Sequence, residues 1–276
     1  MKLLFRILAK LKILRLINVK ISIQVNTKKV VIPINAGIGF DNLNLSETWM
    51  IDVFERLHLP SETTFIDVGV NIGQTLIKLK SVNLNIDYIG FEPNPLCVCY
   101  SEQLVKANDW KNVSIVPAGI SDKTQIIKLN YYTDDQADSC ASIISDFREV
   151  NSVISKSYCA CYSGSELESV LSDKVISLIK FDVEGAEFEV IKSLGDIIKQ
   201  YRPYLLVEIL PSYKVDSIRL IRQESIEKII NDIGYHKYRI CKDKSDCFSH
   251  FKEVASIGVH DRLDWCDYIF SPTSLK

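Results

Sequence analysis

Residues 64–73 read TFIDVGVNIG, and this stretch decides the fold. Thr64 to Val68 is a short apolar run of the kind found in strands that are buried on both faces. Gly69 follows at once and lets the backbone turn, and Gly73 opens a segment, residues 73–80, with helical spacing. A strand that passes through a glycine turn into a helix is the repeating unit of parallel α/β sheets.

The same alternation continues to the end of the chain. Strands are predicted at residues 88–91, 113–116, 175–181 and 204–209, and helices at 95–108, 186–200 and 223–233. Two late strands, 236–241 and 265–270, have no clear helix between them, which predicts an antiparallel hairpin at one edge. We therefore expect an α/β fold with a doubly wound, mostly parallel seven-stranded sheet and an antiparallel edge hairpin.

The N-terminal part of the chain differs in charge from the rest. Residues 1–40 contain eight Lys or Arg and no Asp or Glu, so the other residues carry 25 basic against 35 acidic side chains. Lys2, Arg6 and Lys10 recur every four residues, which predicts an amphipathic helix, and residues 20–34 follow with the pattern of a β-hairpin. We divide the chain into a basic arm, residues 1–45, which holds the amphipathic helix and the β-hairpin, and an α/β domain, residues 46–276.

The basic arm lacks the features of a secretion signal or a membrane span. Lys and Arg interrupt every apolar run, and no stretch approaches the ~20 apolar residues that cross a bilayer. We therefore expect a cytoplasmic protein. The helix within residues 1–17 either packs on the body of the protein or lies on an anionic membrane surface at the inner face of the membrane.

Polar side chains follow the first three strands of the predicted sheet, at the edge where such sheets bind ligands. The first strand ends in Asp67, and Gly69, Asn71 and Gly73 form the loop behind it. Glu92 follows the second strand and is placed to accept hydrogen bonds from ribose hydroxyls, whereas Asp122 follows the third and is placed to accept one from an adenine amino group. This set suits a nucleoside with a cationic amino-acid tail rather than a nucleotide, because a third glycine and a phosphate-binding lysine are both missing.

A second motif makes the prediction more specific. Residues 180–187 read KFDVEGAE, and together with DVGVNIG at 67–73 and GFEPNP at 90–95 they resemble the signatures of the FkbM family of class I, Rossmann-like, S-adenosylmethionine-dependent methyltransferases. The resemblance covers about residues 46–271, and Val70 stands where the family usually has Ala. It implies S-adenosylmethionine as the cofactor and O-methylation of a sugar, a glycan or a natural product.

The candidate catalytic residues lie at the ends of the fourth and fifth strands. Asp182, Glu184 and Glu208 are candidates for a general base, and Lys180 is expected to neutralise nearby acids. A divalent metal held by the same carboxylates is an alternative that we do not favour, and we predict no metal ligands.

Other functions fit the sequence less well. The missing third glycine disfavours a nicotinamide-dependent oxidoreductase, and the acidic loop after the fourth strand together with the pI near 6.1 disfavours nucleic acid as a partner. The acceptor is therefore expected to be a small molecule or a glycan. The alternative to an enzyme is a cofactor-binding module that acts as a membrane-recruited interaction protein.

Overall fold

The computed structural model describes residues 18–133, 141–144, 153–215 and 217–275. The predicted N-terminal helix falls on residues 1–17 and lies outside this part of the chain. Within the described ranges, no helix is long and apolar enough to cross a bilayer.

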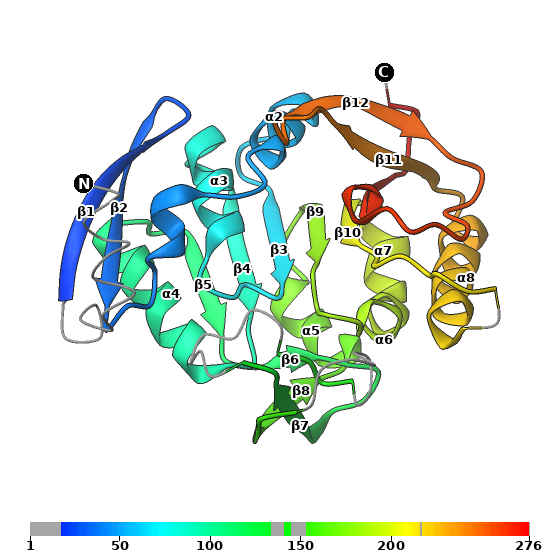
Figure 1. Cartoon of the computed structure of the whole chain (residues 1–276), viewed down its shortest axis with the longest axis horizontal. Coiled ribbons are helices and arrows are strands. Elements are labelled where there is room, and N and C mark those ends of the chain that lie inside the picture. The colour runs from blue at the N-terminus through cyan, green and yellow to red at the C-terminus, as the bar shows by residue number, and fades with distance from the viewer. Residues whose placement is uncertain (1–17, 134–140, 145–152, 216, 276) are drawn as a thin grey trace.

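A central mixed sheet of eight strands organises the molecule (Figure 1). In spatial order its strands are β12 (Phe248–Glu253), β11 (His236–Lys242), β13 (Asp267–Ser271), β10 (Tyr204–Glu208), β9 (Ile176–Phe181), β3 (Thr64–Val68), β4 (Asp87–Phe91) and β5 (Val113–Val116). The last five run parallel to one another, as the strand–helix alternation predicts. Every residue of β3 is buried, because helices cover both faces of the sheet.

The sheet differs from the prediction in strand number and at one edge. It has eight strands rather than seven, because Phe248–Glu253 forms an additional strand, β12. Residues 236–242 and 267–271 are antiparallel neighbours as predicted, but β13 lies between β10 and β11, and the edge hairpin consists of β11 and β12. The sequence conceals β12 because all six of its residues keep solvent contact, so its pattern lacks the alternation of a half-buried strand.

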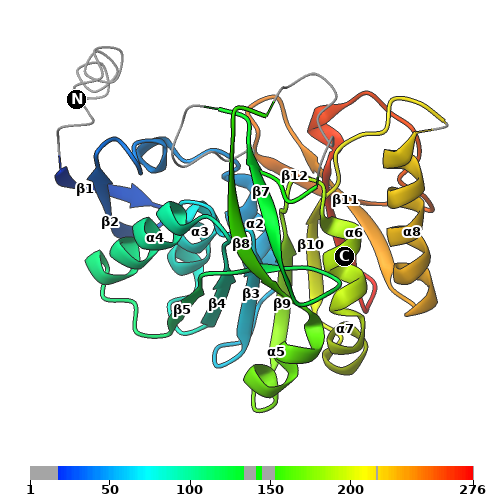
Figure 2. The same cartoon turned by 90° about the horizontal axis from the view of Figure 1, so that it is seen from below.

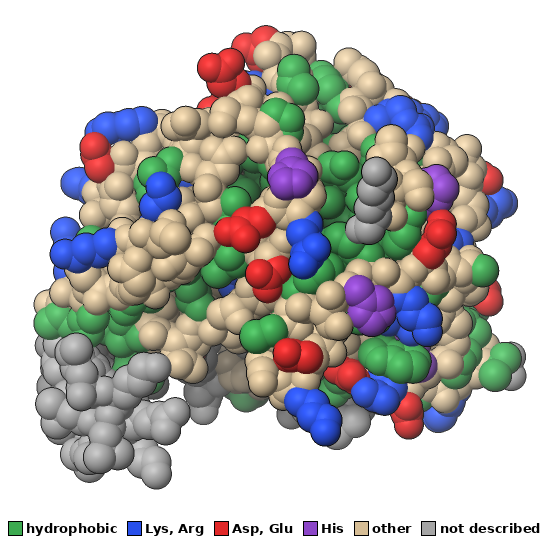
Figure 3. Space-filling model, turned by 90° about the horizontal axis from the view of Figure 1, so that it is seen from above, with side chains coloured by type: hydrophobic (Ala, Val, Ile, Leu, Met, Phe, Trp, Pro, Cys, Tyr) green, Lys and Arg blue, Asp and Glu red, His purple; other side chains and the backbone are tan. Residues whose placement is uncertain are grey.

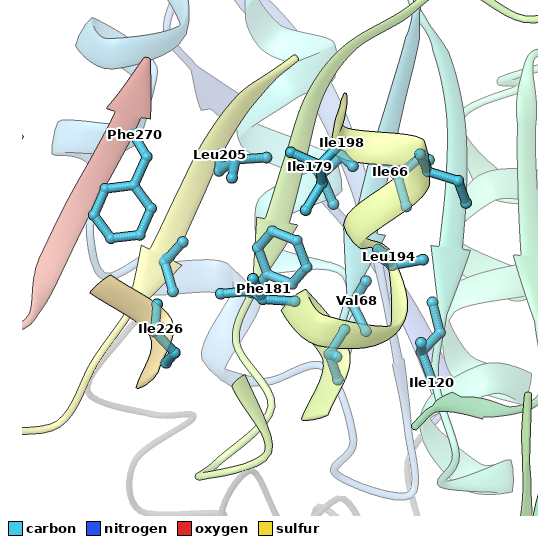
Figure 4. Close-up of a cluster of buried hydrophobic side chains, with 14 of the residues drawn as sticks. Ile66, Val68, Ile120, Ile179, Phe181, Leu194, Ile198, Leu205, Ile226 and Phe270 are labelled. Atoms are coloured by element: carbon cyan, nitrogen blue, oxygen red, sulfur yellow. The ribbon is translucent and has the colours of Figure 1, made fainter. Parts of the chain in front are cut away.

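Helices form a layer on each face of the sheet. On one face lie α2 (Trp49–Arg56), α3 (Gln74–Val82) and α4 (Pro95–Ala107), and on the other lie α5 (Gly164–Leu171), α6 (Glu187–Ser193), α7 (Gly195–Tyr201) and α8 (Ile218–Asp232). Figure 4 shows the core of the second face, where Phe181 and Ile179 of β9 pack against Leu194 and Ile198. The single helix predicted over 186–200 is two helices, because the helix is interrupted at Leu194, just before Gly195.

The predicted N-terminal hairpin is present and adds a layer outside α3 and α4. It consists of β1 (Asn18–Val25) and β2 (Lys28–Asn35), which are paired over their full length. Val25, Val30 and Ile32 of the hairpin are buried against Ile77 of α3 and Leu104 of α4. The short 3₁₀ helix η2 (Asp41–Asn44) then leads the chain to α2. A domain boundary near residue 45 stays a prediction.

A small second sheet crosses the carboxyl ends of the central strands. Its spatial order is β6 (Gly119–Ile120), β8 (Ser155–Tyr162) and β7 (Gln125–Tyr131). In the view from below, β7 and β8 lie in front of the central sheet (Figure 2). Ser142 pairs with Asn130 of β7, and its hydroxyl donates a 2.7 Å hydrogen bond to the carbonyl of Glu184. This contact fixes the small sheet to the loop behind β9. A second short 3₁₀ helix, η3 (Leu263–Trp265), precedes β13.

Candidate functional site

A solvent-connected cavity of about 230 Å³ lies between the carboxyl ends of the central strands and the small sheet. The residues that line it are Ser46, Glu47, Val68, Gly69, Asn71, Gln74, Phe91, Glu92, Pro93, Cys97, Gly119, Ile120, Leu129, Ala141, Ile143, Asp182, Val183, Glu184 and Glu208. Five of these described residues are carboxylic acids, and none of them is Lys, Arg or His. The walls therefore favour a ligand with positive charge or with hydroxyl groups.

The strand register brings two charged side chains together beneath this cavity. Asp67 of β3 and Lys180 of β9 are direct neighbours in the parallel ladder, and Gly90 of β4 flanks Asp67 on its other side. The sequence could not fix which face Lys180 occupies. Lys180 is two residues from Leu178 in β9, so both side chains lie on the face that α2 and α3 cover. Phe181 lies in the core on the opposite face.

The two charges belong to a chain of polar contacts that ends in the cavity. The Tyr88 hydroxyl donates to Asp67 Oδ2 at 2.6 Å, and Lys180 Nζ lies 3.6 Å from Asp67 Oδ1 and 2.9 Å from Asp182 Oδ2. At the far end, the carboxyl groups of Asp182 and Glu208 share a hydrogen bond. Asp67 is completely buried, and Lys180 is 3% exposed. The buried Lys180 ammonium group thus connects Asp67, near the carboxyl end of β3, to the carboxyl groups of Asp182 and Glu208 in the cavity.

The surroundings of Asp182 and Glu208 drive their protonation states apart. Burial alone would raise the pKa of Asp182, but the Lys180 ammonium and the hydrogen bond with Glu208 lower it below its ordinary value. The Asp182 charge raises the pKa of Glu208 well above its ordinary value, and burial adds to this effect. The pKa values of the two carboxyl groups are therefore shifted in opposite directions, and Asp182 is the more readily ionised of the two. Two carboxyl groups with opposed pKa shifts are a common arrangement for acid–base chemistry.

Glu92 occupies the β4 side of the cavity. Its Oε2 accepts the Asn71 N–H at 2.7 Å, and its Oε1 accepts the Asn94 N–H at 2.8 Å. Burial raises the pKa of Glu92 to about 7, although the two N–H donors oppose that shift. Each carboxylate oxygen has a second lone pair, so Glu92 retains the capacity to accept two further hydrogen bonds from a ligand.

Backbone strain is concentrated in the two loops that form the floor of the cavity. Asn71 and Glu184 have left-handed φ values of 50° and 51°, which side-chain-bearing residues seldom adopt. Gly69 has φ of 94°, and a Cβ atom there would lie 1.9 Å from the Asp182 carbonyl oxygen. Only glycine allows the loops behind β3 and β9 to approach so closely.

Six of the ten residues predicted from sequence line the cavity. They are Gly69, Asn71, Glu92, Asp182, Glu184 and Glu208. Asp67, Gly73, Asp122 and Lys180 are not among its lining residues. Asp67 and Lys180 lie beneath it, Gly73 precedes α3 with φ of 76°, and Asp122 is exposed at the end of β6. Direct contact of these four with a cofactor or substrate stays a prediction, as do the individual roles of the six.

The sequence analysis missed the part of the cavity wall that comes from outside the strand ends. Ser46 and Glu47 precede α2, Gln74 and Cys97 lie on α3 and α4, and Leu129, Ala141 and Ile143 belong to the small sheet and its connection. No local motif in the sequence marks these residues as part of a site. Gly119 and Ile120 lie three and two residues before Asp122, so they belong to the same segment after the third predicted strand.

In residues 18–133, 141–144, 153–215 and 217–275, no three His, Cys, Asp or Glu side chains are grouped in a way that would hold an ion.

Comparison with known proteins assigns this site to a family. A model of the FkbM methyltransferase domain matches residues 67–239, more than half of the chain. The chain belongs to the FkbM family of methyltransferases. It is thus an enzyme, a methyltransferase that uses S-adenosylmethionine as methyl donor, and the alternative of a non-enzymatic module is not favoured.

Individual relatives of this FkbM-family chain are distant. Methyltransferase sdnD of Sordaria araneosa is 22% identical over 223 residues, which cover 70% of this chain and 80% of that protein. A crystal structure of methyltransferase FkbM from Methylobacillus flagellatus is 14% identical with a TM-score of 0.44, over 76% of this chain. The matched region spans only 43% of that longer chain. Fibrillarin from Aeropyrum pernix, solved with natively bound S-adenosyl-L-methionine, is 12% identical with a TM-score of 0.42, over 81% of this chain and 71% of that one.

Proposed function

We propose that this methyltransferase O-methylates a hydroxyl group of a neutral small molecule, a sugar or glycan unit or a polyhydroxylated natural product. The observation that carries the proposal is a cavity whose charged lining residues are all carboxylic acids, with Asp182 and Glu208 hydrogen-bonded to each other and shifted in pKa in opposite directions.

The residues of the cavity fit S-adenosylmethionine. Glu92 has lone pairs left for the two ribose hydroxyls, and the acidic walls complement the sulfonium and ammonium charges of the donor. The apolar side chains of Ile120 and Leu129 offer flat contacts for an adenine ring. The donor supplies a methyl group that its sulfonium has already activated, so the protein has to position an acceptor and remove a proton.

Asp182 is the group that takes this proton in our proposal. Lys180 keeps it ionised, and the hydrogen bond with Glu208 fixes the orientation of its carboxylate. Its side chain is 32% exposed, so an acceptor hydroxyl can reach it from the cavity. Orientation and a positioned base together account for much of the acceleration in reactions of this kind.

The charge of the walls also selects the acceptor. A phosphate or carboxylate group would face five acidic side chains without one basic partner among the lining residues. A neutral polyol instead provides hydroxyl donors for the carboxylates. The same repulsion argues against nucleic acid, whose binding proteins present basic surfaces to phosphates.

An acceptor panel tests the proposal. The purified protein is incubated with S-adenosylmethionine and neutral sugars, the matching sugar phosphates and uronic acids, or an RNA, and release of S-adenosylhomocysteine is measured. We expect turnover with neutral hydroxyl acceptors. Transfer confined to anionic sugars or to RNA would overturn the proposed acceptor class.

We also propose that residues 1–17 bring the enzyme to the inner face of an anionic membrane from the cytoplasm. The support is the sequence: eight basic and no acidic residues in 1–40, with an apolar face between the basic positions of 2–12. A chain that starts at residue 18 should bind S-adenosylhomocysteine normally but no longer sediment with vesicles that contain phosphatidylglycerol. Undiminished sedimentation of the shortened chain would refute membrane binding by these residues.

A further inference from the structure

Glu47 is an unassigned carboxylate of the cavity that comes from the N-terminal part of the chain. It immediately precedes the first turn of α2 and has a left-handed φ of 53°. Its side chain is 36% exposed and lines the cavity, as Ser46 and Gln74 also do. A glutamate held in this strained backbone conformation needs surrounding contacts that maintain it.

A buried lysine provides such a contact. The side chain of Lys78, on α3, has no exposed surface, and its Nζ lies 3.2 Å from Glu47 Oε2 and 3.7 Å from Met50 Sδ. Burial lowers the pKa of Lys78, and the Glu47 carboxylate opposes that shift. Fold stability gives little reason for such a pair, because removing the lysine ammonium from water costs free energy that a partly exposed carboxylate offsets only in part. The pair does fix one oxygen of Glu47 and leaves the other available to the cavity.

The sheet order places Glu47 away from the proposed nucleoside end of the site. Glu92 follows β4, which pairs with β3 on the side opposite to β9. Glu47 instead shares a small adjoining cavity with residues that belong to β9, β10 and β13 or directly follow them, on the other side of β3: Lys180, Asp182, Glu208 and Asp267. A donor whose ribose binds Glu92 therefore extends across the Gly69 loop and brings its amino-acid end toward Glu47.

We propose that Glu47 binds the α-ammonium group of the donor's amino-acid end and that Lys78 is the positioning residue that holds Glu47 in place. This inference rests on the proposed donor orientation, and it adds the N-terminal part of the chain to the binding site. The carboxylate supplies the charge complement of an ammonium group, and the buried lysine prevents the carboxylate from turning toward solvent.

Two ligands that differ in the amino-acid tail test this assignment. S-Adenosylhomocysteine carries the ammonium group, whereas 5′-methylthioadenosine has the same nucleoside and thioether without the tail. Glu47→Gln should weaken S-adenosylhomocysteine binding about 10- to 100-fold, the usual effect of losing a hydrogen bond to a charged group. It should change the affinity for 5′-methylthioadenosine less than about twofold, because no contact of that ligand is altered. Isothermal calorimetry on the full chain measures both.

Three further variants protect the test against unfolding and nonspecific effects. Lys78→Met keeps the buried volume and should lower the affinity ratio of the two ligands about 3- to 10-fold, since Glu47 is no longer fixed. The double variant Glu47→Gln, Lys78→Met leaves no unpaired buried ammonium and should reproduce the ligand selectivity of Glu47→Gln. Glu62→Gln is the matched control, because Glu62 also has a left-handed φ, 68°, but is exposed outside the cavity; it should change neither affinity.

The outcomes separate this inference from the proposed function. If the native chain binds neither ligand, the donor site itself is wrong. If the native chain binds both and Glu47→Gln weakens both equally, Glu47 shapes the cavity rather than binding an ammonium group. Unchanged affinity for S-adenosylhomocysteine with a raised KM for the acceptor would place Glu47 at the acceptor instead, and it would overturn the assignment.

Discussion

The two ends of the same parallel strands differ in how their buried charges are satisfied. At the carboxyl end, Asp182, Glu208 and Glu92 have shifted pKa values, and Asn71 and Glu184 have strained backbones. Each of these features costs free energy, and the surrounding structure has to offset that cost. Carboxyl groups with such shifted pKa values still have hydrogen-bonding and charge interactions to gain from a ligand.

The amino end of the strands has the larger cavity, about 640 Å³, between the β1–β2 turn and the segments that lead into β4 and β5. Four of its lining residues are lysines, and one of them, Lys80, is buried. Lys80 Nζ donates to the carbonyls of Ile86 at 2.6 Å and Leu84 at 3.3 Å and to Asn112 Oδ1 at 3.0 Å, so all three of its protons are used. Figure 3 shows this end of the molecule, where charged side chains of both signs are scattered among hydrophobic and neutral atoms.

The comparison teaches that volume does not identify the functional end of this sheet. In the larger cavity, the buried Lys80 ammonium uses all its hydrogen-bond donors. In the smaller cavity, carboxyl groups have shifted pKa values, and two loop residues have left-handed backbones. Perturbed groups that converge in a cavity are the better indicator of chemistry. The predictions below test this contrast.

The largest effect is expected for Asp182→Asn at the carboxyl end. The variant keeps the shape of the side chain and removes the charge that accepts the proton, so turnover should fall at least ~10²-fold. Affinity for S-adenosylhomocysteine should change little. Steady-state kinetics with one accepted substrate, measured beside Glu184→Gln and Glu208→Gln, ranks the three carboxylates. Turnover close to native in Asp182→Asn would remove it from the catalytic step.

A glycine pair gives the second test. Gly69→Ala should lower S-adenosylhomocysteine affinity at least ~10-fold, because its Cβ would lie 1.9 Å from the Asp182 carbonyl and would force the two loops apart. Gly234 lies at the opposite end of the sheet, where a Cβ would meet no atom within 4 Å although φ is 70°. Gly234→Ala should therefore cost only the ~1–2 kcal/mol of left-handed strain and leave ligand binding intact. Calorimetry and urea unfolding separate the two effects, and equal binding losses in both variants would contradict the assignment of the site.

Lys80→Met is the counterpart at the amino end. It should reduce the free energy of unfolding by ~1–3 kcal/mol, because buried acceptors lose a donor, while the folded variant keeps native affinity for S-adenosylhomocysteine. Chemical denaturation and calorimetry measure the two quantities. A loss of ligand affinity without a loss of stability would show that this end of the sheet also contributes to function.

The smallest effects are pH dependences of opposite sign at the two ends. Glu92 has a pKa of about 7 in the folded state, above its ordinary 4.5, so its contribution to stability falls as pH rises from 4.5 to 7. Burial lowers the pKa of Lys80 to about 8 from its ordinary 10.5, so its contribution to stability rises between pH 8 and 10.5. The free energy of unfolding of the native protein minus that of Glu92→Gln should decline between pH 4.5 and 7. The free energy of unfolding of the native protein minus that of Lys80→Met should increase between pH 8 and 10.5. Each change should be on the order of 1 kcal/mol or more. Denaturant titrations across both windows provide the check, and a common sign for the two differences would refute the contrast.

Local sequence signals determined much of this protein. The run TFIDVGVNIG specifies strand, glycine turn and helix, because burial on both faces and a left-handed turn each restrict which residues are accepted. Asn94 and Pro95 likewise predict the start of α4, and the Asn94 side chain accepts the Leu96 N–H there. The two signatures around Asp67 and Asp182 were sufficient for the family, since they lie at strand ends that a parallel sheet must bring to one edge.

Tertiary structure decided what each of these side chains can touch. The sequence predicts Asp67 as a cofactor-binding carboxylate, which stays a prediction, and only the structure shows that the register with Lys180 and the Tyr88 hydroxyl place it beneath the cavity. Glu47 carries no local motif, and it reaches the cavity because α2 packs on α3 beside Lys78. The physical reason is range: caps, turns and periodicity depend on neighbours within a few residues, whereas contacts between segments far apart in the chain depend on packing that no local pattern records.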